Sequence, residues 1–280
     1  EGTNAFYGGN APNDSSGRIR YVQVKYSGFE ISPNNELQGI TAAGAGSGTV
    51  LEYFHIHNSS DDGIEIFGGT MNARYLVVTG ADDDSIDTDT GWNGAIQFGI
   101  VIQRPGGGDR MNEWSAIRRE PYSRPKVANF TYIGRAGGGA AIMLNQGTQA
   151  SFYNSVLTRP TGGSGDGAIC LAIADDNTKG TFHSVYMSCP TAFKDARAQA
   201  DFQAGSNNTT INEGVTNTAG VGGNAFSSAS GNIGVNVASG NNNAQKNAMA
   251  ASVATAAYAQ ASVSSNQMSS GNETSNAGSY

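Results

Sequence analysis

The sequence predicts an all-β solenoid with a short capping helix and a C-terminal, β-prone extension rich in Asn, Ser, Ala and Gly. Three observations carry this prediction. One segment recurs at a fixed offset, apolar residues alternate with polar ones in short runs, and the composition changes near residue 205. Alternation with a period of two is typical of strands, and a repeat of about 20–50 residues is typical of stacked architectures.

The clearest repeat relates residues 53–73, YFHIHNSSDDGIEIFGGTMNA, to residues 75–95, YLVVTGADDDSIDTDTGWNGA. At an offset of 22 residues the aligned pairs are Tyr53 and Tyr75, Asp61 and Asp83, Asp62 and Asp84, Ile64 and Ile86, Gly69 and Gly91, and Ala73 and Ala95. One structural unit is therefore used twice.

Weaker copies extend the repeat in both directions. Residues 20–28 resemble residues 52–60, and Phe130 and Phe152 place residues 129–134 and 151–156 at the same offset of 22. Residues 181–189 follow after a longer loop. A strand pair of ~22 residues cannot enclose its own core, but stacked copies bury a continuous column of apolar side chains. The fixed offset therefore favours a solenoid over a β-sandwich.

These rungs resemble the right-handed parallel β-helix proteins that bacteria secrete, and the resemblance covers about residues 15–190. It implies a right-handed parallel β-helix in a secreted bacterial protein, extracellular or at the cell surface. We assign residues 1–205 to this domain. Residues 191–204 place Phe193, Ala196 and Ala200 at helical spacing after a candidate N-cap at Thr191, so we expect a helix there that caps the last rung.

Residues 104–124, RPGGGDRMNEWSAIRREPYSR, interrupt the repeat. We expect this insertion to form a loop or short helix that projects from the stack. Its cationic and aromatic side chains would suit a sugar or a partner protein, and an ordinary packed loop is the alternative. The candidate ligand-binding or partner-binding residues are Arg104, Arg110, Trp114, Arg118 and Arg119.

The composition of the C-terminal segment, residues 206–280, differs from that of the repeats. Residues 201–280 contain four charged side chains, no proline and 14 of the chain's 27 asparagines. Residues 230–254, SGNIGVNVASGNNNAQKNAMAASVA, alternate on both sides of an Asn-rich turn, a pattern that closely stacked strands favour. This segment resembles the imperfect repeats of bacterial biofilm functional amyloids, which also join a GVNVA-like strand to a Gln and Asn turn. A disordered linker is the alternative. The residues assigned to self-assembly are Ile233, Val235, Val237, Met249 and Val253.

Aspartates are concentrated in residues 80–91, GADDDSIDTDTG, and two more lie one repeat earlier. Calcium binding is one interpretation, because this cation takes roughly six to eight oxygen ligands. Catalysis is a second, since β-helix folds host polysaccharide lyases and hydrolases and since Arg104 or Arg110 would lie within one rung. Hydrogen bonding at stacked turns is a third, purely structural interpretation. The candidate calcium ligands are Asp61, Asp62, Asp83, Asp84 and Asp87.

Charge and composition exclude some classes of function. The formal net charge of −7 repels phosphate backbones, so we expect no nucleic-acid partner. No apolar run reaches the roughly 18 residues of a membrane span. The two cysteines, Cys170 and Cys189, form either a disulfide or a pair of buried thiols.

These features predict a secreted, non-enzymatic structural protein that self-assembles into an extracellular filament or biofilm-matrix fibre. Strands in residues 206–280 would mediate the contact between subunits. The expected partners are other copies of the chain and extracellular polysaccharide, and calcium is the candidate cofactor. The alternative is a polysaccharide lyase, a glycoside hydrolase or a sugar-binding adhesin that uses the acidic rungs and the Arg-rich insertion.

Overall fold

A computed structural model describes residues 6–32, 35–117 and 120–212. The chain divides into two units, residues 1–215 and 216–280, and all strands and helices given below belong to the first. The residues assigned to self-assembly, Ile233, Val235, Val237, Met249 and Val253, lie outside the described residues.

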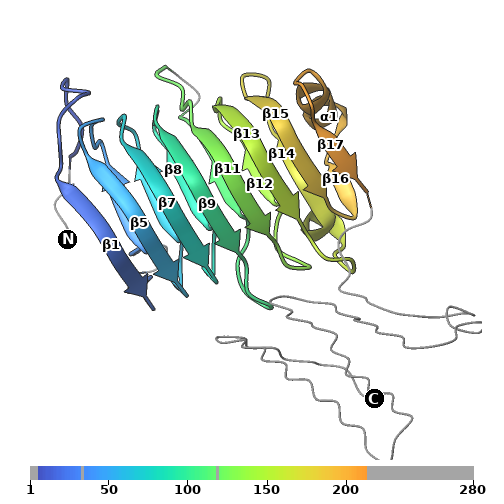
Figure 1. The fold of residues 1–280 in the computed structure, drawn as a ribbon, viewed down its shortest axis with the longest axis horizontal. Helices are drawn as coiled ribbons and strands as arrows, with labels where there is room; N and C mark the ends of the chain where they lie inside the picture. The colour runs from blue at the N-terminus through green and yellow to red at the C-terminus, as the bar shows by residue number, and fades with distance from the viewer. Residues whose placement is uncertain (1–5, 33–34, 118–119, 213–280) are drawn as a thin grey trace, which may run out of the picture. The chain divides into compact units, whose positions relative to one another are not determined.

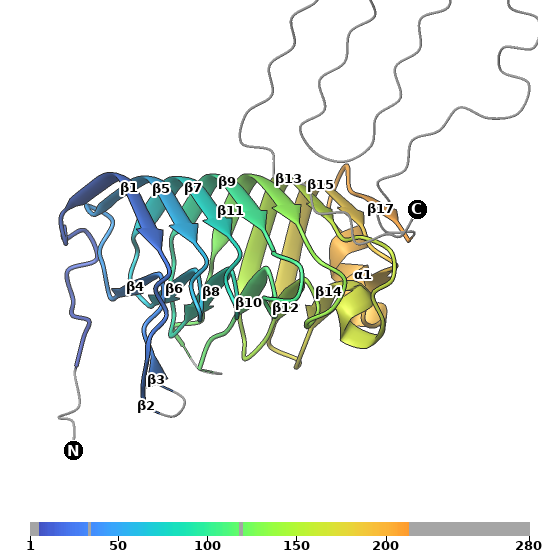
Figure 2. The same cartoon turned by 90° about the horizontal axis from the view of Figure 1, so that it is seen from below.

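The first unit is a right-handed parallel β-helix built from two sheets of parallel strands (Figures 1 and 2). The eight-stranded sheet contains, in spatial order, β1 (Arg18–Lys25), β5 (Val50–His57), β7 (Asn72–Thr79), β9 (Ala95–Ile102), β11 (Lys126–Ile133), β13 (Gln149–Thr158), β15 (Lys179–Ser188) and β17 (Thr209–Ile211). The seven-stranded sheet contains β4 (Ile40–Ala43), β6 (Ile64–Phe67), β8 (Ile86–Asp89), β10 (Asn112–Trp114), β12 (Ile142–Leu144), β14 (Ile169–Ile173) and β16 (Thr191–Phe193). Each rung from β1 to β16 therefore supplies one long and one short strand, and the three-residue β17 ends the eight-stranded sheet.

Three smaller elements complete this unit. Strands β2 (Glu30–Ser32) and β3 (Asn35–Glu36) form an antiparallel pair that projects from the first rung (Figure 2). A 3-10 helix, η1 (Gly165–Ala168), precedes β14. Helix α1 (Ala196–Gln203) lies at the C-terminal end of the stack (Figure 2).

The core lies between the two sheets, where inward side chains of successive rungs stack. In β6 and β8, for example, Ile64 pairs with Ile86 and both are fully buried. Burial of one such side chain stabilises the fold by roughly 1.5–3 kcal/mol. The 22-residue offset of the sequence is the register of these strands, and the match of residues 20–28 to 52–60 is also correct, since Val22 pairs with Phe54.

Each long strand from β1 to β15 bends at a single residue with φ between 43° and 62°. The bend directs two consecutive side chains outward, as Glu52 and Tyr53 show between the buried Leu51 and Phe54. The bend residues are, in rung order, Tyr21, Tyr53, Tyr75, Phe98, Asn129, Asn154 and Ser184. Asn tolerates this left-handed conformation, but bulky side chains adopt it rarely. The first four bends therefore carry residues that the local backbone disfavours.

Two register predictions are wrong. Ala73 pairs with Ile96 instead of Ala95, and Phe152 pairs with Val127 instead of Phe130. The ring of Phe130 instead packs against the preceding rung at Gly99, where an added Cβ would lie 2.1 Å from that ring. The loops between rungs differ in length, so the register follows core packing and not a constant offset.

The end of the stack also differs from the prediction. Residues 191–193 form strand β16, and α1 begins five residues after the expected N-cap at Thr191. Asp195 is the actual N-cap, and its carboxylate accepts hydrogen bonds from the backbone of Arg197 and Ala198. Beyond the expected boundary at residue 205, β17 still pairs with β15.

The predicted insertion, residues 104–124, is in part a regular rung. Strand β10 lies within it and pairs with both β8 and β12. Trp114 is fully buried, stacks on Phe152 at a ring-centroid distance of 4.9 Å, and donates a hydrogen bond to the carbonyl oxygen of Ile86. It is therefore a core residue and not an exposed partner-binding one. The two candidates Arg118 and Arg119 lie outside the described residues.

The two cysteines are buried and form a disulfide. It joins Cys170 in β14 to Cys189, which directly follows β15. The bond therefore links the two sheets near the C-terminal end of the stack.

Candidate cation-binding face

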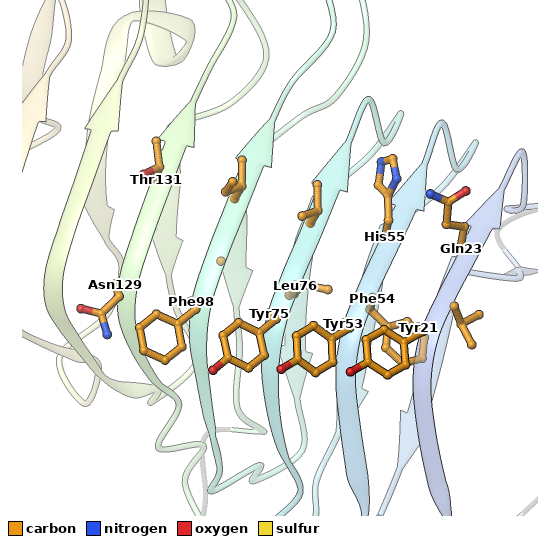
Figure 3. A pocket seen from close by; sticks show the side chains of 14 residues that line it. Tyr21, Gln23, Tyr53, Phe54, His55, Tyr75, Leu76, Phe98, Asn129 and Thr131 are labelled. Atoms are coloured by element: carbon orange, nitrogen blue, oxygen red, sulfur yellow. The ribbon is translucent and has the colours of Figure 1, made fainter. Parts of the chain in front are cut away.

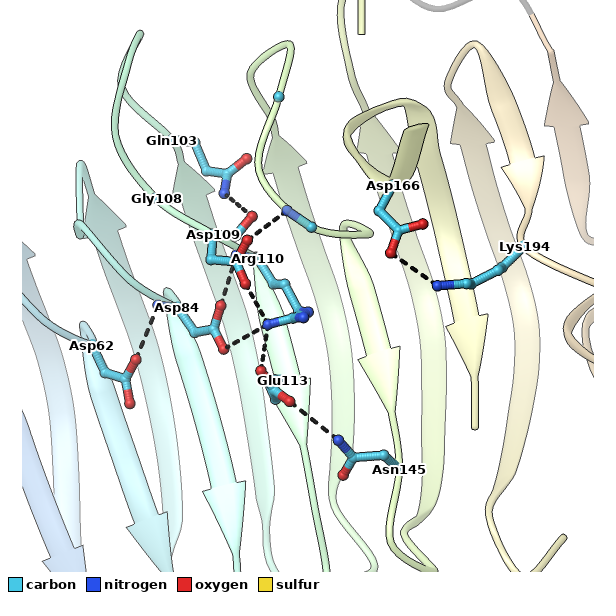
Figure 4. Close-up of polar contacts among 12 residues, drawn as sticks. Asp62, Asp84, Gln103, Gly108, Asp109, Arg110, Glu113, Asn145, Asp166 and Lys194 are labelled. Carbon is cyan, nitrogen blue, oxygen red and sulfur yellow. Dashed lines mark hydrogen bonds and ion pairs between the residues drawn. The ribbon is translucent and has the colours of Figure 1, made fainter. Parts of the chain in front are cut away.

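Nine side chains from three consecutive rungs form what we call the acidic face, beside β6, β8 and β10. Figure 4 labels five of them, Asp62, Asp84, Asp109, Arg110 and Glu113. Each rung supplies two residues from the turn before the short strand and one from the strand. They are Asp61, Asp62 and Glu65 from the first rung, Asp83, Asp84 and Asp87 from the second, and Asp109, Arg110 and Glu113 from the third. Eight of the nine positions are thus carboxylates.

The local sequence explains this arrangement. Strand β6 alternates, so Glu65 points outward between the inward Ile64 and Ile66, and it pairs with Asp87 in the next rung. Gly63 follows the aspartate pair because there is no room for a side chain: an added Cβ would lie 2.5 Å from the carbonyl oxygen of Ser85. The turn can therefore lie directly against its neighbour, and successive carboxylates come close together.

In the first two rungs, the second aspartate of the turn accepts a hydrogen bond from the backbone of the following rung. The backbone N–H of Asp84 donates to Asp62 Oδ1 at 2.9 Å, and the backbone N–H of Arg110 donates to Asp84 Oδ1 at 2.6 Å (Figure 4). Both carboxyl groups are buried. Two of the five candidate calcium ligands thus have the structural role that stacked turns suggest, and each retains its second oxygen for other contacts.

The carboxylates of the face approach one another closely. Three groups have ligand atoms that all lie within 4.8 Å of one another. They are Asp61, Asp62 and Asp83; Asp62, Glu65 and Asp87; and Asp83, Asp84 and Asp109. These groups share members, so the face is one continuous array of oxygen atoms.

Arg110 replaces the capping aspartate in the third rung. Its guanidinium pairs with Asp109, with Glu113 at 2.5 Å and with Asp84 at 4.0 Å. Burial alone would lower the pKa of Arg110, but Glu113, Asp84 and Asp109 raise it above its usual value. This side chain therefore stays charged, neutralises part of the third rung and reaches Asp84 of the second, and it is the one cationic side chain among the nine residues of the face.

Burial and crowding change the acidity of the face. Burial, followed by the charges of Asp87 and Asp61, raises the pKa of Asp62 to about 9. Burial also raises the pKa of Asp87 to about 8 and that of Glu65 to about 7, with neighbouring carboxylates adding to both. Burial and Asp62 raise the pKa of Asp84 well above its ordinary value. At neutral pH these groups therefore retain protons or require a cation.

A hard divalent cation suits this chemistry. Calcium takes oxygen ligands at about 2.3–2.6 Å, and carboxylates are its preferred protein ligands. The five predicted ligands, Asp61, Asp62, Asp83, Asp84 and Asp87, lie together on the face, and calcium binding by them stays a prediction.

The structure separates the cationic candidates of the insertion. Arg110 belongs to the acidic face and lies within one rung of the aspartates, as predicted. Arg104 pairs with Asp82 at the edge of the same turn. Neither guanidinium is free for a ligand.

Three residues of the face were missed by sequence reasoning, namely Glu65, Asp109 and Glu113. Glu65 could have been found, because it aligns with Asp87 at the 22-residue offset. Glu113 and Asp109 lie in the segment taken as an insertion, where the spacing to the previous rung lengthens: Asp87 pairs with Glu113, 26 residues later.

The family of the chain follows from a family model described as a pectate-lyase-like β-helix domain, which matches residues 1–231. The chain belongs to this family. No solved structure matches it. Within the described residues of this pectate-lyase-like β-helix protein, no helix combines the length and apolarity needed to cross a membrane.

The pectate-lyase-like β-helix protein is also similar to the functional amyloid subunit FapC of Pseudomonas aeruginosa. The two are 33% identical over 158 residues, which cover 51% of this chain. The matched segment spans 45% of the length of FapC.

Proposed function

We propose that this chain is a structural subunit of an extracellular filament or matrix, in which β-helix domains associate through the open edge at β1. One observation carries the proposal. Strand β1 stands at the end of its sheet and, within the described residues, is hydrogen-bonded to β5 alone. An unpaired strand edge is a template for a strand from another molecule.

The side chains of β1 support this. Ile19 pairs with Leu51 and so points toward the core, yet 46% of its surface is exposed. Val22 and Val24 also point toward the core and are only partly buried. Such apolar exposure at a strand edge favours association with a second copy.

The core at the opposite end of the stack is covered, although the last strand, β17, is paired with β15 alone within the described residues. Helix α1 inserts Phe202 against Phe182 and Phe193, and Phe202 is 3% exposed. The two ends are therefore different, which suits directional growth.

The relationship to a functional amyloid subunit supports an assembly role, and the disulfide suits an oxidising extracellular setting. Calcium at the acidic face would neutralise its repulsion and rigidify the rungs. In this proposal the cation is structural.

Sedimentation velocity and negative-stain imaging, with calcium or with chelator, test the proposal. We expect filaments from the full chain and at least a tenfold loss of assembled material for Ile19→Lys. Val156→Lys is the matched control, because Val156 is exposed to a similar extent, 41%, in β13. Equal assembly of both variants, or a strictly monomeric full chain, would contradict the proposal.

A truncated chain tests the role of the C-terminal segment separately. It should end at Asn212, because a chain ending at residue 205 also loses β17. If filaments of the truncated chain match those of the full chain, residues 213–280 do not mediate the subunit contact.

The alternative function is a carbohydrate-active enzyme. Glu65 and Asp87 lie opposite each other with raised pKa values, which would suit a general acid next to a carboxylate. Incubation with polygalacturonate and other acidic polysaccharides, with and without calcium, tests it. Cleavage that Asp87→Asn abolishes would support the enzyme.

A further inference from the structure

A groove crosses five strands of the eight-stranded sheet on the outer face of the β-helix (Figure 3). Its volume is about 700 Å³, within the usual range of roughly 300–1,000 Å³ for small-molecule sites. One wall is the row of bend residues Tyr21, Tyr53, Tyr75, Phe98 and Asn129. The other wall is formed by Gln23, His55, Val77, Ile100 and Thr131.

The aromatic wall is rigid and regular. Its ring centroids are 4.6, 4.5 and 5.2 Å apart from Tyr21 to Phe98, and successive rings are tilted by 10° or less. Figure 3 shows the rings side by side with open faces, so the stacking is offset. The wall consequently presents ring faces and tyrosine hydroxyl groups along the groove.

The four aromatic bend residues have a left-handed backbone conformation. At the equivalent bends of the later rungs, small polar residues have this conformation. Asn129, Asn154 and Ser184 continue the row in the later rungs with similar backbone angles. Bulky residues in the left-handed region are genuine outliers, and such outliers cluster at ligand-binding sites. All four aromatic bends line the groove, and Asn129 is the bend residue at its end.

We propose that this groove binds an elongated, planar aromatic molecule that lies along the axis of the β-helix. Four strand spacings of about 4.8 Å give a length near 19 Å. A flat conjugated ligand would lie along this row of rings in the favoured offset-stacked arrangement.

Charge in the groove agrees with this ligand class. No Asp, Glu, Lys or Arg lines it, and the amide and hydroxyl groups of Gln23, Asn129 and Thr131 lie at its two ends. The tyrosine hydroxyl groups and His55 add hydrogen-bonding groups along the otherwise apolar groove, which suits a molecule that is aromatic along its length and carries polar substituents.

Thioflavin T, an elongated planar dye, is the first probe, together with its uncharged benzothiazole-aniline analogue, which the acidic face cannot attract. Both are titrated into protein that sedimentation shows to be monomeric. We expect saturable fluorescence from the monomer and at least a tenfold weaker affinity for the double variant Tyr53→Asn, Tyr75→Asn. Asparagine keeps the bend conformation, because it is the residue used at Asn129 and Asn154.

Tyr153→Asn is the matched control, since Tyr153 is 40% exposed outside the groove, and its binding should be unchanged. Ile100→Lys is a second disruptive variant that leaves the aromatic row intact, and it should also abolish binding of the uncharged dye. Fluorescence only in sedimenting material, equal affinity in the double variant, or displacement by soluble oligosaccharides would overturn the proposal. Assembly is measured separately by sedimentation, so this result does not depend on the proposed filament.

Discussion

The acidic face and the aromatic wall of the groove lie on different sheets of one β-helix, and each stacks one kind of side chain over consecutive rungs. A rung spacing of about 4.8 Å places equivalent positions close together. For carboxylates this stacking is repulsive, and it adds to burial in raising the pKa values of Asp62 and Asp87. For aromatic rings it is attractive, as the parallel rings of Tyr53 and Tyr75 show. The solenoid thus repeats the same kind of side chain at each stacked position, so the attraction or repulsion between neighbours is repeated along the stack.

Both regions also carry a local cost. An aromatic pair contributes about 0.5–1.5 kcal/mol beyond its burial, and a left-handed bulky residue costs about 1–3 kcal/mol. In the acidic face, carboxyl groups are held against their preferred ionisation. Sites that break local rules in this way are expected to be functional.

The pH dependence of stability is the largest expected difference between the two regions. A carboxyl whose pKa is raised in the folded state stabilises the fold fully below its unfolded pKa, near 4, and loses this contribution as pH rises through the folded value. In chelator we therefore expect the free energy of unfolding to fall by several kcal/mol between about pH 4 and pH 9, where Asp62 titrates. Urea unfolding across this range measures it. Because calcium binds the ionised groups, the stabilisation that calcium adds should grow with pH. A free energy of unfolding that does not change with pH in chelator would contradict the raised pKa values of these carboxyl groups.

The floor of the groove can be broken by filling Gly99. Gly99→Val places side-chain atoms within the ring of Phe130, and we expect a loss of about 3 kcal/mol, the upper end for overpacked cores. Gly9→Val is the control, since no atom lies within 4 Å of a Cβ there. Equal unfolding midpoints in urea for the two variants would mean that Phe130 does not pack against Gly99.

The acidic repulsion can be relieved at one residue. Asp62→Asn keeps the acceptor for the backbone N–H of Asp84 but removes a buried carboxyl that must stay protonated at pH 8, far above its unfolded pKa. In chelator at pH 8 we expect a gain of about 1–2 kcal/mol, together with a weaker calcium response by titration calorimetry. Asp82→Asn is the control, because Asp82 is exposed and paired with Arg104. A destabilised Asp62→Asn protein would indicate that its charge is already compensated.

The smallest effect is expected in the aromatic wall. Tyr75→Asn removes two stacking contacts and relieves the strained bend, so we expect the free energy of unfolding to change by less than about 1 kcal/mol. Thermal and urea unfolding measure it. A loss well above this value would mean that stacking, and not ligand binding, explains the aromatic residues.

Several features were predictable from local sequence because their spacing is constant. The offset that aligns Asp61 with Asp83 also aligns Ile64 with Ile86, and this coincidence is sufficient for the solenoid and for five members of the acidic face. Glu113 and the core position of Trp114 were not predictable in this way, since a longer loop precedes their rung.

The sequence by itself determined the stacking of like residues, because two short rungs of equal length repeat their pattern along the chain. Only the tertiary structure decided the pairing of Phe152 with Val127, the packing of Phe130 on Gly99 and the aromatic row at the bends. These depend on loops of unequal length and on which side chains fit together across rungs. Periodicity in one chain specifies that residues stack, whereas packing between distant segments specifies which residues do.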